Sequence, residues 1–494
     1  MRRIVTPVLL LAVALAALFG ANSLSDQLHE NLGEVADTDA APPGVGTPLV
    51  STRRLAEMLA PSLAEPEFFT GLDALMATAP VSSCLTVMLD DRVFYESGGG
   101  IQVMPSEAML LPTLATAHKV LGPDHTFTTT VQSVVPVENG VVNGDIYLVG
   151  GGDPLLYTPA YAAARDEGDN PLHTPIEDLA QDLVDQGLAL VTGAVVGDAD
   201  RFDDLRYAGS WPERIIASQN IGTLLALQFD DGWVQFPTQE PNEEGDTDAE
   251  EEPEGFVAAE DPPFYAAALF DDMLEARDVV IRRSPRAEAF PDGEEPNVLA
   301  AIESAPLSDL YHQILDNRDI ETTEMLLKEV GRVTSGTGST RAGTQAIAAV
   351  VAGIGVDIDQ FQLLQFDGSG VDPANIATCP VFTSLLRSSE FRPLFHDLLP
   401  TAAEDAGLLA RFADVDRPSR IRALTGGTAD TTVIMGYVDI GRDQELTFAF
   451  IANQQGADDN QAIRQLETRI VRHLATLTAQ PSLDDIGLEP LRLG

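Results

Sequence analysis

The chain has 494 residues and carries 77 acidic against 29 basic side chains, a formal net charge of −48. A chain of this length exceeds one ordinary core, so two or three domains are expected. The charge excludes a basic face for nucleic-acid phosphates and argues equally against binding to anionic lipid, so we read the acidic surface as a solubility feature.

The N-terminus has the pattern of an export segment. A short basic stretch, residues 1–3, precedes the almost wholly apolar residues 4–21. This pattern predicts a secretory signal or an uncleaved membrane anchor, and the length leaves both open because about 17 residues are the minimum for spanning a bilayer. The polar residues 22–50 predict a tether. The remainder is expected outside the cytoplasm, with membrane contact only through the N-terminal segment.

The first folded part is predicted to contain helices and one hairpin. Apolar spacing predicts helices over residues 53–63 and 69–76, and residues 84–89 and 93–95 predict two strands joined by a turn at 90–91. A mostly apolar helix is expected over residues 105–122. Pro112 is expected to kink or restart it, because proline removes a backbone donor.

The middle of the chain reads as short strands and turns. Strands are predicted over residues 127–135, 141–149 and 191–197, with an amphipathic helix over 176–186. Residues 240–263 hold eleven acidic side chains and no basic one. Such a run cannot bury itself, so we expect a solvated loop. Calcium binding is not favoured, because the run lacks alternating ligands closed by a glutamate.

Helices return in the last third. They are predicted over residues 299–316, 322–333, 343–353, 380–387 and 460–477, with strands over 432–440 and 445–453. Helices and a hairpin at both ends therefore flank a β-rich middle. This order predicts an α/β domain formed by residues 51–125 and 296–480, an inserted β-rich region over 126–295, and a tail over 481–494.

Cys84 and Cys379 are the only cysteines of the chain. An even number in an exported protein suggests a disulfide, the alternative being two buried thiols. Two cysteines cannot form a metal cluster, and the histidines show no HExxH or paired spacing. The sequence therefore suggests no metal and no cofactor.

Four segments, taken in order, carry a resemblance to one family. They are LGP with FTT at 121–129, VVNGDIYLVGGGDPLL at 141–156, VTGAVVGDADRFDD at 191–204, and DGSGV with PAN at 367–375. Each resembles a segment of peptidase family S13, the D-alanyl-D-alanine carboxypeptidases/endopeptidases among the low-molecular-mass penicillin-binding proteins. The resemblance runs from about residue 105 to 430. It implies a penicillin-binding-protein/β-lactamase-like fold, with an antiparallel sheet against helices.

The resemblance also implies where the family's three catalytic motifs lie. The family uses a serine nucleophile at a helix start, a lysine three residues later, a Ser-x-Asn motif and a Lys-Thr-Gly strand. Spacing to the neighbouring segments places these motifs at Glu107 and Leu110, at Leu315 and Asn317, and at Leu424, Thr425 and Gly426. A leucine can neither accept a proton nor carry charge, and no serine stands at position 107.

We therefore expect a pseudoenzyme that no longer forms a serine acyl-enzyme. Asn317, Thr425 and Gly426 are left as possible ligand-binding residues, and the expected partner is a peptidoglycan stem peptide or a cell-wall enzyme. Glu107 is then read as an acidic side chain that complements the helix dipole.

Two alternatives remain. One is an active D,D-peptidase with unrecognised residues, although Ser106 has Met109 at i+3 and the pair Thr116 and Lys119 lies in mid-helix. The other is an acidic exported scaffold that binds proteins through residues 240–263.

Overall fold

The computed structural model describes residues 66–165, 172–218, 221–237, 255–358, 363–428, 430–454 and 461–478. The predicted export segment, tether, first helix (53–63) and tail lie outside the described residues. Residues 61–480 form one compact unit. No helix in the described ranges is both long and apolar enough to span a bilayer.

The central sheet joins strands from the two ends of the chain. It contains β1 (Ser82–Leu89), β2 (Arg92–Ser97), β15 (Ile421–Gly426), β16 (Thr431–Gly441) and β17 (Gln444–Asn453), in the order β15-β16-β17-β1-β2. All neighbours are antiparallel, and β1 pairs with β17 along its whole length. The two predicted hairpins are therefore confirmed, and they meet in one sheet.

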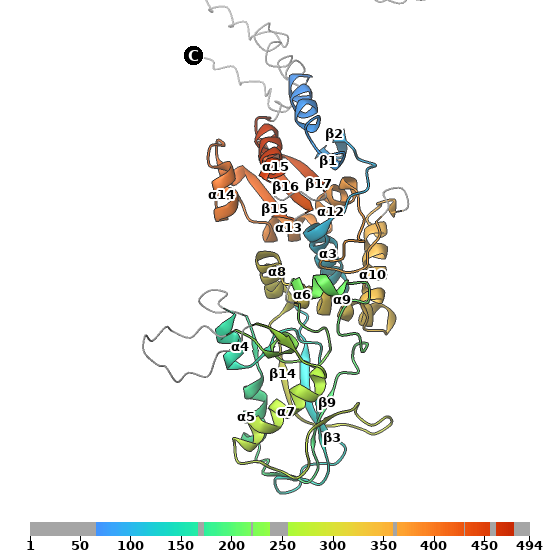
Figure 1. Ribbon diagram of the computed structural model, residues 1–494, viewed down its shortest axis with the longest axis vertical. Coiled ribbons are helices and arrows are strands. Elements are labelled where there is room, and N and C mark those ends of the chain that lie inside the picture. The colour runs from blue at the N-terminus through green and yellow to red at the C-terminus, as the bar shows by residue number, and fades with distance from the viewer. Residues whose placement is uncertain are drawn as a thin grey trace, which may run out of the picture. The chain divides into compact units, whose positions relative to one another are not determined.

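Helices cover both faces of this sheet (Figure 1). One face carries α3 (Leu110–Val120), α12 (Cys379–Arg387) and α13 (Arg392–Leu398); the other carries the helix over 66–76, α14 (Ala406–Phe412) and α15 (Gln461–Leu474). Side chains alternate between the two cores, because successive residues of a strand point to opposite faces. Along β15, Leu424 thus joins the first core and Ala423 the second.

Three more helices pack around α3. They are α8 (Leu307–Asn317), α9 (Ile320–Ser335) and α10 (Thr340–Gly353). Asp319 caps α9 by accepting from the Thr322 amide, and Ser339 caps α10 by accepting from the Ala342 amide. The 3-10 turn η1 (Ser106–Met109) precedes α3, so Pro112 lies in the first turn of the restarted helix, where a missing donor costs little.

The strands between β2 and β15 form other sheets. A five-stranded sheet has the order β13-β9-β5-β3-β14 and a three-stranded sheet the order β12-β8-β4, beside the pairs β6-β7 and β10-β11. The strands are β3 (Thr128–Ser133), β4 (Val141–Val142), β5 (Ile146–Val149), β6 (Leu156–Tyr157), β7 (Thr174–Pro175), β8 (Leu190–Val191), β9 (Val195–Asp198), β10 (Trp233–Gln235), β11 (Val257–Ala258), β12 (Val280–Ile281), β13 (Arg286–Ala287) and β14 (Asn297–Glu303). The helices are α4 (Pro159–Ala164), α5 (Ile176–Asp185), α6 (Glu213–Ser218) and α7 (Pro262–Glu275), with the 3-10 turns η2 (Asp230–Gly232) and η3 (Pro418–Arg420).

Four predictions need correction. The strands predicted over 141–149 and 191–197 are each divided in two, as β4 and β5 and as β8 and β9, and the two halves belong to different sheets. The helix predicted over 299–316 begins only at Leu307, because residues 297–303 form β14, which pairs with β3. The alanines in this segment favour a helix, but its pairing with β3 makes it a strand. The loop predicted over 240–263 ends early: β11 and the start of α7 lie within it, and Asp261 caps α7. Residues 238–254 lie outside the described ranges.

The predicted disulfide is confirmed. Cys84 on β1 and Cys379 at the start of α12 are bonded, with their Cα atoms 5.9 Å apart and a separation of 295 positions in sequence. The bond ties the first strand to a helix from the last third of the chain.

Replacing both cysteines by alanine should lower the free energy of unfolding by about 3 kcal/mol, because the unfolded chain regains the entropy of a long closed loop. Guanidinium unfolding of the wild type and of the double variant measures this difference. Adding a reductant should destabilise the wild type and leave the variant unchanged. Equal midpoints of the oxidised wild type and the variant would contradict the prediction.

Candidate active-site pocket

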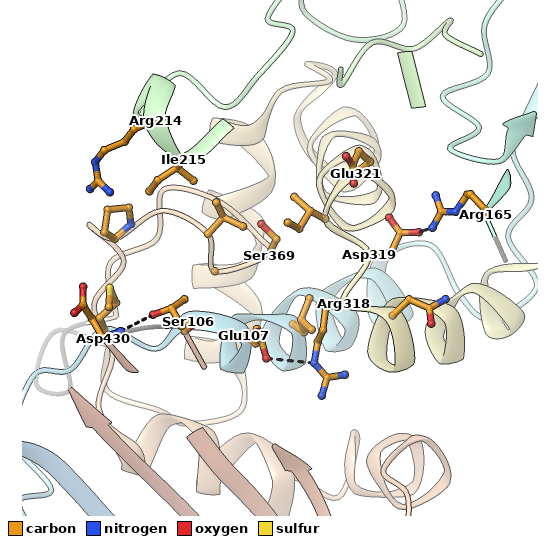
Figure 2. A pocket seen from close by; sticks show the side chains of 18 residues that line it. Ser106, Glu107, Arg165, Arg214, Ile215, Arg318, Asp319, Glu321, Ser369 and Asp430 are labelled. Atoms are coloured by element: carbon orange, nitrogen blue, oxygen red, sulfur yellow. Dashed lines mark hydrogen bonds and ion pairs between the residues drawn. The ribbon is translucent and has the colours of Figure 1, made fainter. Parts of the chain in front are cut away.

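A pocket of about 530 Å³ opens where η1, the α8–α9 turn and the loop after β15 meet (Figure 2). Its lining consists of Met104, Ser106, Glu107, Leu110, Arg165, Arg214, Ile215, Asn317, Arg318, Asp319, Ile320, Glu321, Ser369, Gly370, Val371, Pro373, Thr428 and Asp430. The predicted inserted region over 126–295 contributes Arg165, Arg214 and Ile215 to this lining.

The structure brings only part of the predicted site set together. Glu107, Leu110 and Asn317 line the pocket. Thr425 and Gly426 lie on β15 directly beside Glu107, and a Cβ on Gly426 would collide with Oε2 of Glu107. Leu424 does not line the pocket, and it is buried in the same hydrophobic core as Leu110.

Leu315, the expected start of the second motif, points away from the pocket. It is 3% exposed in the helical core, because α8 continues to Asn317 and directs this side chain inward. The residue that enters the pocket at this turn is Arg318, which has a left-handed backbone (φ 57°) between α8 and α9. The sequence analysis missed it. The signal was Asp319 with Thr322, an N-cap pattern that places the start of α9 directly after Arg318.

The Glu107 carboxylate is held by the Arg318 guanidinium and by a backbone amide directly after β15. Its Oε2 atom accepts from Nε of Arg318 at 3.2 Å and from the backbone amide of Gly427 at 3.2 Å. Nη2 of Arg318 also donates to the carbonyl oxygen of Thr425 at 2.6 Å. The helix start where the family resemblance expects a nucleophile therefore presents an ion-paired carboxylate.

Ser106 and Ser369 are the two buried serines that line the pocket, and the hydroxyl of Ser369 is bonded to a carboxylate outside the lining. Ser369 Oγ donates to Oε1 of Glu324 at 2.7 Å, and the same oxygen accepts from the amides of Ser369 and Gly368. Burial, together with the neighbouring carboxylate of Asp367, raises the pKa of Glu324 to about 8. These contacts position the loop that carries Ser369 and Gly370, and Gly370 must stay small because a Cβ there would meet the carbonyl oxygen of Ser106.

Neither lysine reaches the pocket. Lys119 and Lys328 are the only lysines of the chain. Lys119 lies in the last turn of α3 and pairs with Glu390 at 2.9 Å, while Thr116 donates to the carbonyl of Pro112. Lys328 is buried in α9 and donates to Asp203. The pair of Thr116 and Lys119, considered for the alternative of an active peptidase, therefore lies outside the lining.

One wall of the pocket is rich in carboxylates. Arg165 bonds to Asp231 at 2.6 Å and to Asp319 at 3.4 Å, and Glu321 accepts from the amide of Gly222 at 2.6 Å. Burial, reinforced by Asp231 and Asp319, raises the pKa of Glu321 to about 8. A single arginine thus bridges carboxylates from two distant parts of the chain, and Figure 2 shows its contact with Asp319.

Comparison with known proteins identifies the family. The profile of the D-Ala-D-Ala carboxypeptidase 3 (S13) family matches residues 73–256 and 247–476. A D-alanyl-D-alanine carboxypeptidase of Actinomadura sp. is 27% identical over 422 residues, covering 73% of this chain and 75% of the relative. Carboxypeptidase DacB of Mycolicibacterium smegmatis is 25% identical over 445 residues, covering 87% and 86%.

The fold agrees with this result. The crystal structure of penicillin binding protein 4 (dacB) from Haemophilus influenzae superposes with a TM-score of 0.66 at 18% identity, covering 82% of this chain and 99% of that chain. The predicted penicillin-binding-protein fold of the α/β class is thereby confirmed. Because the family profile spans most of the sequence, the chain belongs to the D-Ala-D-Ala carboxypeptidase 3 (S13) family.

Proposed function

We propose that this protein is a non-catalytic S13 family member that binds peptidoglycan stem peptides in the pocket around Glu107. One observation carries the proposal: the carboxylate of Glu107 occupies the helix start and is locked to Arg318, while both lysines of the chain are committed elsewhere. A serine acyl-enzyme needs a hydroxyl beside a base, and Ser369 faces a carboxyl whose raised pKa keeps it largely protonated at neutral pH.

The two leucines support the same proposal. Leu110 and Leu424 belong to one buried core. Burying a lysine at either position would cost several kcal/mol in desolvation. Apolar packing at these positions stabilises the fold and removes the proton acceptors. The pocket itself stays open at about 530 Å³, within the range of small-ligand sites.

We infer that the protein acts outside the cytoplasm, on or near the cell wall. The bonded cysteines support this location, because disulfides persist in oxidising compartments. The relatives named above are carboxypeptidases, and stem peptides ending in D-Ala-D-Ala are the ligands that the resemblance implies.

Incubation with fluorescent penicillin tests the loss of catalysis. We expect no increase in intact mass and no labelled band, while the Actinomadura relative under the same conditions serves as the positive control. A covalent adduct would establish the alternative, an active D,D-peptidase, and peptide mapping of the adduct would identify its nucleophile, with Ser106 and Ser369 as the first candidates.

Calorimetric titration with an N-acetylated peptide ending in D-Ala-D-Ala tests binding. We expect a Kd on the order of 1 mM or tighter. Pro373→Trp, on the exposed rim of the pocket, should abolish this binding by filling the opening. Ala374→Trp is the matched control, because Ala374 is the exposed neighbour of Pro373 and does not line the pocket. Equal binding by both variants would place the ligand elsewhere.

A further inference from the structure

The outer edge of the central sheet is closed by side chains at the pocket. β15 pairs with β16 on one side only, so its other edge presents backbone groups that need partners. Near the start of β15 those partners are backbone: the Ala402 amide donates to the carbonyl of Ile421, and the Ala423 amide donates to the carbonyl of Pro400. At the pocket end, the carbonyl of Thr425 and the amide of Gly427 bond to side chains instead.

The side chains of Arg318 and Glu107 provide the donor and the acceptor that an additional β-strand would provide at this edge. A neighbouring peptide supplies an N–H donor to one edge carbonyl and a C=O acceptor to the next edge amide. Here Arg318 supplies the donor to Thr425 at 2.6 Å, and Glu107 supplies the acceptor to Gly427 at 3.2 Å. The two are joined by their own ion pair at 3.2 Å. Gly426 lets them lie against the strand, because any Cβ there would collide with the Glu107 carboxylate.

We propose that the ion pair of Glu107 and Arg318 is an internal plug on the β15 edge, and that a peptide enters the pocket by displacing it. This inference rests on the proposed function and specifies how its site is regulated. The displacing ligand is an extended peptide with a free C-terminal carboxylate. This carboxylate replaces Glu107 as the ion-pair partner of Arg318, and a carbonyl oxygen of the peptide replaces it as the acceptor for the Gly427 amide.

The contacts allow such an exchange. The side chains of Arg318 and Glu107 are 33% and 26% exposed, so water reaches both partners while they separate. Solvated ion pairs are weak, and a single hydrogen bond adds little. Releasing the plug should therefore cost a ligand about one order of magnitude in affinity.

The test compares Glu107→Ala with the wild type, using the N-acetylated D-Ala-D-Ala peptide as a free acid and as a C-terminal amide. We expect Glu107→Ala to bind the free-acid peptide about tenfold more tightly than the wild type does. The increase in affinity should be smaller for the C-terminally amidated peptide, because this peptide can use the freed Gly427 N–H but has no carboxylate to pair with Arg318. Arg318→Asn, which tolerates the left-handed backbone, should show no gain for the acid. Glu390→Ala, which breaks an ion pair outside the pocket, should bind like the wild type.

The outcomes separate the plug from the proposed function. Equal or weaker binding of the acid by Glu107→Ala, with measurable binding by the wild type, overturns the plug and leaves the proposed function standing. Binding by Glu107→Ala alone supports the plug and contradicts binding by the natural chain. No binding by either protein overturns both.

A measurement without ligand checks the plug independently. Amide hydrogen exchange of the segment over residues 421–428 should be faster in Glu107→Ala than in the wild type, because the Gly427 amide loses its acceptor. Unchanged exchange would overturn the plug whatever the binding result.

Discussion

Replacing Lys328 by methionine should lower the free energy of unfolding by about 4 kcal/mol, one of the two largest single-site effects that we expect. The Lys328 side chain is 1% exposed, and its ammonium donates to Oδ1 of Asp203 at 2.7 Å and to the carbonyls of Leu205 and Leu224 at 2.9 and 2.8 Å. Methionine matches its volume and provides no donor, so two carbonyls and a carboxylate lose their partner together.

Lys119→Met is the matched control, because it removes the other lysine of the chain. Its ion pair with Glu390 is well exposed at both ends, so the expected loss is below about 1 kcal/mol. Urea unfolding of the three proteins gives the comparison. Similar stabilities of the two variants would show that the Lys328 contacts are not structural, and would reopen the question of its role.

Stability should fall as the pH rises from about 5 to about 9, and Glu324→Gln should make this fall shallower. Burial raises the pKa of Glu324 from 4.5 to about 8. A carboxyl with a raised folded-state pKa stabilises the fold fully below its unfolded pKa, and that contribution is lost as the pH passes through the folded value. For one such group the loss is on the order of 5 kcal/mol, at about 1.4 kcal/mol per pKa unit. Glu321, with a pKa raised to about 8 by burial and by two neighbouring aspartates, changes stability in the same direction.

Glutamine keeps the accepting oxygen for the Gly368 and Ser369 donors and carries no ionisable proton. Thermal unfolding across this pH range should therefore be flatter for Glu324→Gln, and the variant should be the more stable protein near pH 9. Glu390→Gln, at an exposed position, should follow the wild type. A curve for Glu324→Gln as steep as that of the wild type would refute the assignment.

Local patterns were enough to predict most elements. The hairpin of β1 and β2, the amphipathic helix α5 and the final strands follow from spacing and turn residues. The prediction was wrong for β14, because its alanines favour a helix and only the β3 partner makes them a strand. It was also incomplete for α7, because the acidic run that suggests a loop ends in a residue that caps this helix.

The sequence by itself determined the family, the absence of serine at position 107 and the scarcity of lysine, because these depend on residue identity and order along the chain. It suggested the disulfide, which the structure confirmed. Only the tertiary structure decided that Arg318 and not Leu315 enters the pocket, and that Glu107 closes the edge of β15. The physical reason is that both results depend on side chains more than two hundred residues apart, whose meeting is set by how α8 ends and how the sheet joins the two ends of the chain.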